Sequence, residues 1–194
     1  FGINKKLQIN STGVISPDLS RLVYTETYYY PPLNQTTSAI YLINLDQSVD
    51  AIQRILKAKG ESKERDPLLS TVINSSQIFN TLTIVDWSQD GQKLLIKEKI
   101  GENQRSLWLT RLWVYDFKTK QAKRLDNIRE AISYYWKNNH GLHLKNHAWD
   151  IKPLGWDRQN PSRIIVNAYG YGNNSKRFLG CWSIDTKDGL TLLI

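Results

Sequence analysis

The alternation of apolar and polar residues between positions 85 and 125 predicts four short β-strands in succession. The expected strands are 85–87, 93–98, 112–117 and 122–125. Two polar segments, Ser88–Gly91 and Lys118–Gln121, separate the first strand from the second and the third from the fourth. Both are rich in turn formers, because Asp and Ser side chains bond nearby backbone and Gly tolerates positive φ. The pattern therefore predicts an antiparallel meander.

The same pattern recurs along the chain with a period of about 70 residues. Ser16 precedes Ser88, and Leu22 precedes Leu94, by 72 positions in each case. A third copy continues through Ile164, which follows Leu94 by 70 positions. Because three degenerate copies arise by chance less easily than one motif, we expect a repeat protein.

The best-preserved copy resembles a known family. It contains Trp-Ser-x-Asp-Gly-x-x-Leu at 87–94, an aromatic-bearing strand, and Asp-hydrophobic-x-Thr at 116–119. This motif resembles the repeat of TolB-like β-propellers, which also occurs in the propeller domains of prolyl-oligopeptidase-type enzymes, and it covers about 40 residues, close to one repeat. The resemblance implies an all-β fold of four-stranded antiparallel blades. Leu19 stands where the turn glycine is expected, and an unrelated all-β or α+β domain is the alternative.

We expect one domain over 1–194 with three blades and two helical insertions. The blades are assigned to about 7–46, 77–125 and 142–194, and the insertions to 47–76 and 126–141. Three blades do not close a ring, since propellers have four to eight. The chain is therefore one portion of a larger propeller, an open stack of blades with helices over the edges, or a unit that associates with another chain.

Both insertions carry apolar residues at helical spacing. The first helix is expected over 48–59, between a capping Ser48 and Gly60. In the second helix, Asn127 and Glu130 have the spacing of a capping box. Its expected apolar face consists of Ile128, Ala131, Ile132, Tyr135 and Trp136. Such insertions either form a binding face or cover a blade edge.

The net charge of +8 favours acidic partners such as a polyanionic glycan. The basic residues are dispersed without a run of five, so nucleic-acid binding is not expected. No apolar segment approaches the ~20 residues that cross a bilayer, so no transmembrane segment is expected. A single cysteine, Cys181, excludes an internal disulfide.

The sequence contains no recognisable catalytic signature. It lacks the Gly-x-Ser-x-Gly nucleophile elbow and any Gly-rich phosphate loop, so we expect a non-catalytic chain without a cofactor. His140, His143, His147 and Asp150 are metal-ligand types, and a strand over 142–148 would place His143 and His147 on one face. Their spacing matches no strong motif, so loop and edge-strand histidines are the interpretation we adopt, and no metal site is assigned.

Aromatic residues are the remaining functional signal. Trp87 and Trp156 occupy corresponding repeat positions and are expected in the core. The residues expected to bind a partner lie in or beside loops and insertions: Trp108, Trp136, Tyr29 and Tyr171. Trp and Tyr dominate the energetics of protein interfaces and also stack on sugars.

The TolB-like resemblance implies a non-catalytic protein-binding or scaffold module, in bacteria often outside the cytoplasm, in the periplasm or cell envelope. Two alternatives stay open. The chain is an accessory propeller domain of a larger hydrolase, or it binds a glycan or another polyanion through exposed Trp and Tyr. Fold alone does not separate these functions.

Overall fold

The computed structural model describes residues 7–45, 66–73, 77–102, 105–172 and 175–194. This part of the chain is mostly β-structure with one α-helix, in agreement with the expected all-β class. The helix expected over 48–59 lies outside the described residues. Within the described part, no helix has the length and apolar character needed to cross a membrane.

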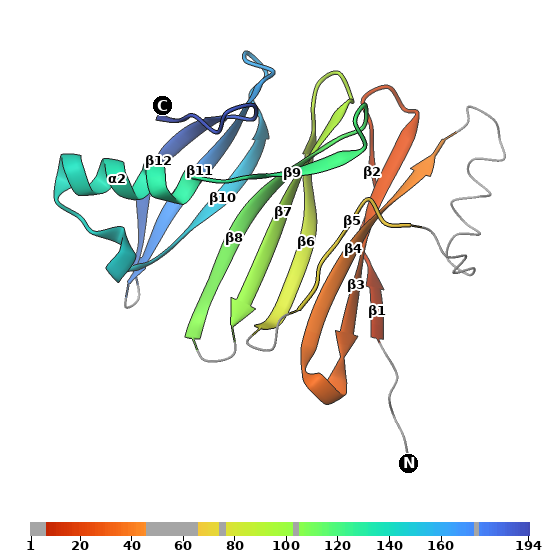
Figure 1. The fold of residues 1–194 in the computed structure, drawn as a ribbon, viewed down its shortest axis with the longest axis horizontal. Coiled ribbons are helices and arrows are strands. Elements are labelled where there is room, and N and C mark those ends of the chain that lie inside the picture. The colour runs from red at the N-terminus through yellow and green to blue at the C-terminus, as the bar shows by residue number, and fades with distance from the viewer. Residues whose placement is uncertain (1–6, 46–65, 74–76, 103–104, 173–174) are drawn as a thin grey trace.

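Nine described strands form one sheet and four form another (Figure 1). The first sheet contains β1 Leu7–Asn10, β2 Val14–Ile15, β3 Arg21–Tyr30, β4 Gln35–Asn44, β5 Leu69–Ser70, β6 Gln77–Trp87, β7 Lys93–Glu102, β8 Arg105–Asp116 and β9 Gln121–Leu125. The second contains β10 Ala148–Trp156, β11 Arg163–Gly172, β12 Ser175–Asp185 and β13 Thr191–Leu193. Neither sheet closes on itself.

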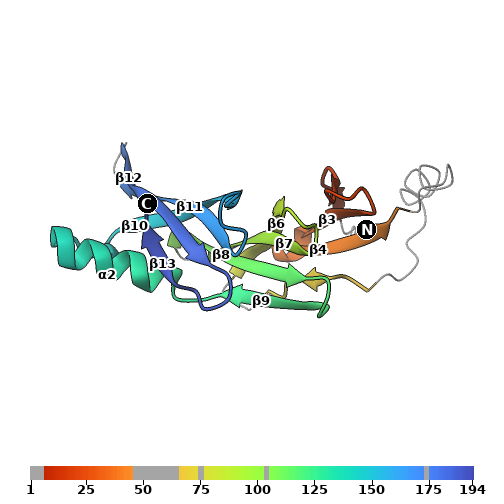
Figure 2. The ribbon, with the colours of Figure 1, turned by 90° about the horizontal axis from the view of Figure 1, so that it is seen from above.

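Two antiparallel meanders, β6–β9 and β10–β13, pair consecutive strands. The sequence predicts the first of them, although its strands are longer than expected. The N-terminal strands join this meander through a short parallel pairing of β4 with β6, at Thr36–Phe79 and Thr37–Asn80. The N-terminal strands and the second meander lie at opposite ends of an elongated molecule (Figure 2).

The hairpin between β3 and β4 is tighter than expected. Pro31 and Pro32 interrupt sheet pairing, so the sequence predicts a polar loop over 33–38 after them. In the structure, β4 already begins at Gln35, which pairs with Tyr30. The reason is a short 3-10 helix at Pro31–Leu33, followed by Asn34 in the left-handed conformation. The proline pair therefore closes the hairpin, and the loop prediction was wrong.

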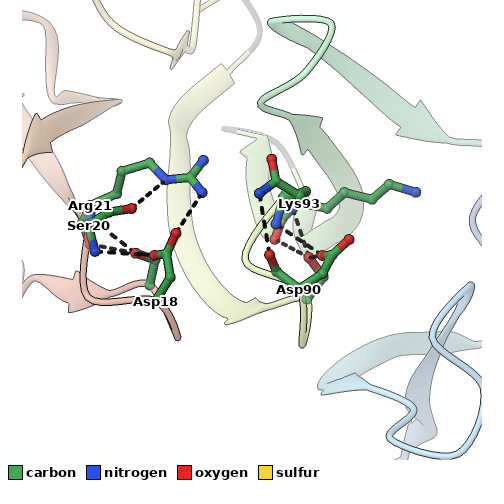
Figure 3. A network of polar contacts seen from close by, with 8 residues as sticks. Asp18, Ser20, Arg21, Asp90 and Lys93 are labelled. Carbon is green, nitrogen blue, oxygen red and sulfur yellow. Dashed lines mark hydrogen bonds and ion pairs between the residues drawn. The ribbon is translucent and has the colours of Figure 1, made fainter.

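The two best-matched repeat turns have the same hydrogen-bond network (Figure 3). In each turn the serine hydroxyl accepts a hydrogen bond from the backbone N–H five positions later. Ser16 accepts from Arg21 at 3.0 Å, and Ser88 accepts from Lys93 at 2.8 Å. Each serine also donates to the carboxylate two positions on, Asp18 or Asp90. Serine and aspartate residues 72 positions apart thus make equivalent hydrogen bonds in the two turns.

The Asp90 turn predicts a stability effect at low pH. Hydrogen bonds from the Ser88 hydroxyl and the Gln92 N–H lower the pKa of Asp90 below its usual 3.8. A lowered folded-state pKa stabilises the fold above the usual value, and this stabilisation is lost as the pH falls below 3.8. We expect Ser88→Ala to lower the free energy of unfolding by about 1 kcal/mol at neutral pH and to reduce the loss on acidification.

Urea unfolding at neutral and acidic pH measures this effect. Ser70→Ala, at an exposed serine of β5, is the matched control and is expected to behave like the wild type at both pH values. Equal acid sensitivity of Ser88→Ala and the wild type would contradict the role assigned to the turn.

Two hydrophobic cores lie in the described structure, one on each side of the β6–β9 meander. The first packs β7, β8 and β9 against helix α2 (Ile128–His140) and against β10–β12. The second packs β6–β8 against β3 and β4. Trp87 and Trp156 are both buried, as predicted, and contribute to different cores.

Helix α2 confirms the helix predicted after Leu125, and Ile128 and Ile132 of its expected apolar face are buried. The predicted capping box does not form, because Asn127 has φ 69° and its side chain makes no capping bond. After Gly141, the strand over 142–148 that would have placed His143 and His147 on one face does not form. A 3-10 helix, η2 at Leu144–Asn146, buries Leu144, and β10 begins only at Ala148.

Candidate functional site

Two of the four predicted binding aromatics meet at the same end of the two meanders. Trp108 of β8 is 44% exposed and Tyr171 of β11 is 39% exposed. Their rings pack edge to face with centroids 6.2 Å apart. The Lys99 ammonium lies 4.4 Å from the centre of the Trp108 ring, which is a cation–π contact. Exposed Trp and Tyr side chains are the types that most often anchor protein partners.

Trp108 also lines an open groove of about 750 Å³ between α2, η2 and the strands β8 and β10. The groove residues are Trp108, Leu109, Arg129, Glu130, Ser133, Tyr134, Lys137, His143, Leu144, Lys145, His147, Ala148 and Trp149. The lining thus combines three Trp or Tyr side chains with three Arg or Lys side chains. We call this open groove the α2 groove.

A buried polar cluster fixes one wall of the α2 groove. The Asp150 carboxylate, 4% exposed, accepts hydrogen bonds from the Thr110 N–H at 3.1 Å and the Thr110 hydroxyl at 2.6 Å. It also accepts one from Arg129 at 3.2 Å, and Arg129 in turn donates to the Trp149 carbonyl at 3.1 Å. The guanidinium stacks 3.9 Å from the centre of the Trp149 ring. Burial lowers the pKa of Arg129, and Asp150 opposes this effect.

The remaining charges of the α2 groove are mainly positive. Lys137 lies on α2 and Lys145 on η2, and both are exposed. Within the part of the chain that the structure describes, neither forms an ion pair. Glu130 supplies the one carboxylate of the lining. Because Asp150 neutralises Arg129, the two lysines give the exposed lining of the α2 groove a net positive charge. We call this net positive charge the open charge of the groove.

The other two predicted binding aromatics lie elsewhere. Trp136 packs against the first core, and its indole N–H donates to the Leu179 carbonyl at 2.9 Å. Tyr29 lies at the far end of the molecule on β3, where its hydroxyl donates to Asn34 at 3.3 Å. The structure therefore does not bring these two residues to the α2 groove.

The three histidines do not gather at one point. His140 packs its ring 4.3 Å from that of Trp136, while His143 and His147 line the α2 groove. Asp150 bonds Thr110 and Arg129 instead of approaching the histidines. In the described ranges, no three His, Cys, Asp or Glu side chains gather as a set of metal ligands.

The sequence analysis did not identify several residues of the α2 groove as candidate binding residues. Arg129, Ser133 and Lys137, together with Glu130 and Tyr134, follow helical spacing on the face of α2 opposite to its apolar face. This second periodicity is the signal that would have identified them. Lys145 and Trp149 carry no such signal, because their place depends on the path of η2 and β10.

Comparison with known proteins gives a fold likeness and no family. No family model matches the chain, and no curated protein matches it. Among solved structures, an isopeptidase chain, AtxE2 in its apo form, is similar with a TM-score of 0.51 and 12% identity. That match covers 94% of this chain and 28% of the isopeptidase chain.

An acylaminoacyl peptidase from Pyrococcus horikoshii is similar over 96% of this chain and 24% of its own, with a TM-score of 0.48 and 16% identity. This chain thus spans about a quarter of the length of such chains. The described structure is a β-rich protein built of antiparallel meanders, and its fold is similar to part of the isopeptidase chain.

Proposed function

We propose that the chain is part of a β-propeller of TolB-like type, with the three blades assigned from the sequence. The repeat supports this arrangement, because equivalent residues of its three copies line one cavity of about 350 Å³. These are Ile15, Trp87 and Trp156 and, two positions later in each copy, Pro17, Gln89 and Arg158. Blades placed around a common axis bring equivalent positions together in this way.

On this framework the chain acts as a non-catalytic protein-binding module. The observation that carries the proposal is the exposed Trp108–Tyr171 pair at the α2 groove. Aromatic anchors beside a concave surface are typical of interface hot spots. Both aromatic residues come from long strands, so they are held in place before a partner arrives. An extracytoplasmic location remains part of this proposal, from the TolB-like resemblance.

The test is an affinity capture from the source organism's lysate with two matched baits. We expect the wild-type chain to retain a protein that the double variant Trp108→Ala, Tyr171→Ala loses by about tenfold or more, since aromatic hot spots contribute 2 kcal/mol or more. Leu33→Ala, at an exposed apolar residue of the β3–β4 hairpin, is the control and is expected to retain the partner. Equal capture of the partner by the wild-type chain and by the double variant would contradict the proposal.

A second candidate function is an accessory segment of a larger hydrolase. The fold likeness to the isopeptidase chain, of which this chain covers 28%, favours it. A fluorophosphonate probe applied to the natural full-length polypeptide distinguishes the two functions, because it labels an activated serine. Labelling that disappears on substitution of a serine outside 1–194 would support the accessory role, and an unlabelled polypeptide would count against it.

A further inference from the structure

The α2 groove has the chemistry of a receptor for one kind of ligand. We infer that it binds an acidic peptide segment that carries apolar side chains between its carboxylates. This inference rests on the proposed protein-binding function and names the chemical class of the partner. Three observations support it: the open charge, the aromatic lining and the preorganised wall.

The open charge selects an acidic ligand. Lys137 and Lys145 approach the α2 groove from α2 and η2, so a ligand lying between these elements meets an ammonium group from each. Their charges are exposed and, among the described residues, make no ion pair. Charge complementarity increases the association rate and discriminates against basic partners.

The aromatic lining selects apolar side chains between the acidic ones. Trp108 and Tyr134 are exposed at 44% and 70%, and Trp149 is buried at the wall. Large exposed rings in a concave site gain free energy when they are covered. A ligand with charge alone would leave them in water, so the α2 groove favours a segment in which acidic and apolar residues alternate.

The wall of the α2 groove is organised before binding. Arg129 is fixed by Asp150, by the Trp149 carbonyl and by stacking on the Trp149 ring. A prearranged wall reduces the ordering that a ligand must impose. Because Asp150 compensates the charge of Arg129, Arg129 contributes to the shape of the wall. The preference for an acidic ligand then comes from Lys137 and Lys145.

The same features disfavour nucleic acid. Its binding relies on many cations that follow a regular phosphate backbone. Here two lysines, which make no ion pair among the described residues, line the α2 groove, and Glu130 lies between the α2 positions of Arg129 and Lys137. A continuous chain of phosphates meets repulsion at Glu130, whereas a peptide can place an apolar side chain there.

The test is fluorescence anisotropy with labelled peptides of about twelve residues. One peptide alternates Asp or Glu with Leu or Phe, and the second has Lys in place of every acid. We expect the chain to bind the acidic peptide at least about tenfold more tightly than the basic one, with binding that weakens as salt rises. The double variant Lys137→Glu, Lys145→Glu is expected to lose about tenfold or more in affinity for the acidic peptide.

Lys120→Glu, in the turn between β8 and β9, is the matched control for charge and is expected to bind like the wild type. Circular dichroism of each variant shows whether it is folded. Equal affinity of wild type and double variant, or equal affinity for both peptides, overturns the inference. Tighter, lysine-dependent binding of a sulfated oligosaccharide or a single-stranded oligonucleotide than of the acidic peptide also overturns it.

Failure of this inference is distinguishable from failure of the proposed function. A lysate partner that depends on Trp108 and Tyr171, without binding of the acidic peptide, refutes the peptide class and leaves the module standing. Peptide binding through Lys137 and Lys145 without any such lysate partner supports the peptide class and contradicts the role assigned to the aromatic pair.

Discussion

Replacing Asp150 by alanine is expected to lower the free energy of unfolding by about 3 kcal/mol. The substitution leaves the Thr110 N–H without its acceptor and leaves Arg129 without its counter-charge. Removing one partner of a buried ion pair costs about 3–5 kcal/mol. The lower end applies because the Arg129 side chain is 29% exposed and gains water contacts when the pair is lost.

The control for Asp150→Ala is Asp126→Ala, which removes another Arg–Asp pair. Arg124 and Asp126 are closer, at 2.6 Å, but their side chains are 43% and 59% exposed. Solvent screening limits such a pair to about 1 kcal/mol or less. Urea unfolding monitored by tryptophan fluorescence compares the two variants. Similar losses would contradict the view that burial, rather than distance, sets the contribution of Asp150.

Replacing Trp182 by alanine is expected to cost about 3–5 kcal/mol, the range for a large ring removed from a core. Trp182 is 2% exposed, and its indole N–H donates to the Leu179 carbonyl at 3.1 Å. Its ring packs edge to face against Tyr135 of α2 at 5.2 Å between centroids. The variant therefore loses a contact between β12 and the helix that supplies one side of the α2 groove.

The same substitution at Trp108 is the matched control for Trp182→Ala. Trp108 is 44% exposed, so its removal leaves no enclosed cavity and is expected to cost about 1 kcal/mol or less in stability. Thermal unfolding of both variants gives the comparison. Equal stability losses would contradict the assignment of Trp182 to the core, whereas a binding defect confined to Trp108→Ala would support the role of the aromatic pair.

Local signals in the sequence predicted most of the secondary structure. Strands β7 and β9 contain the segments expected at 93–98 and 122–125, and α2 follows its apolar periodicity. The errors arose where backbone conformation outweighed side-chain pattern. A 3-10 turn shortened the β3–β4 connection, and another occupies Leu144–Asn146, where a strand over 142–148 had been considered for the histidines.

The candidate site was harder to predict, because its contacts join segments far apart in sequence. Trp108 and Tyr171 were selected as loop aromatics, but nothing local indicates that they touch. Asp150 is the clearest case. Beside the histidines it suggests a metal ligand, yet its partner Thr110 lies 40 positions earlier. Sequence pattern reports burial and periodicity, and long-range pairing follows only from the complete fold.

The β6–β9 meander packs a hydrophobic core against each of its two faces, and this has an evolutionary consequence. Along β7, Leu94 and Ile96 enter the core with β3 and β4, whereas Leu95 enters the core with α2 and β10–β12. Loss of the N-terminal strands or of the C-terminal meander uncovers one side of this layer. Loss of the layer itself leaves both flanking units without a partner. Duplication or deletion at the ends of the chain can therefore change this protein with less disruption than in the middle. Substitutions in the β6–β9 meander are constrained by packing on both of its faces.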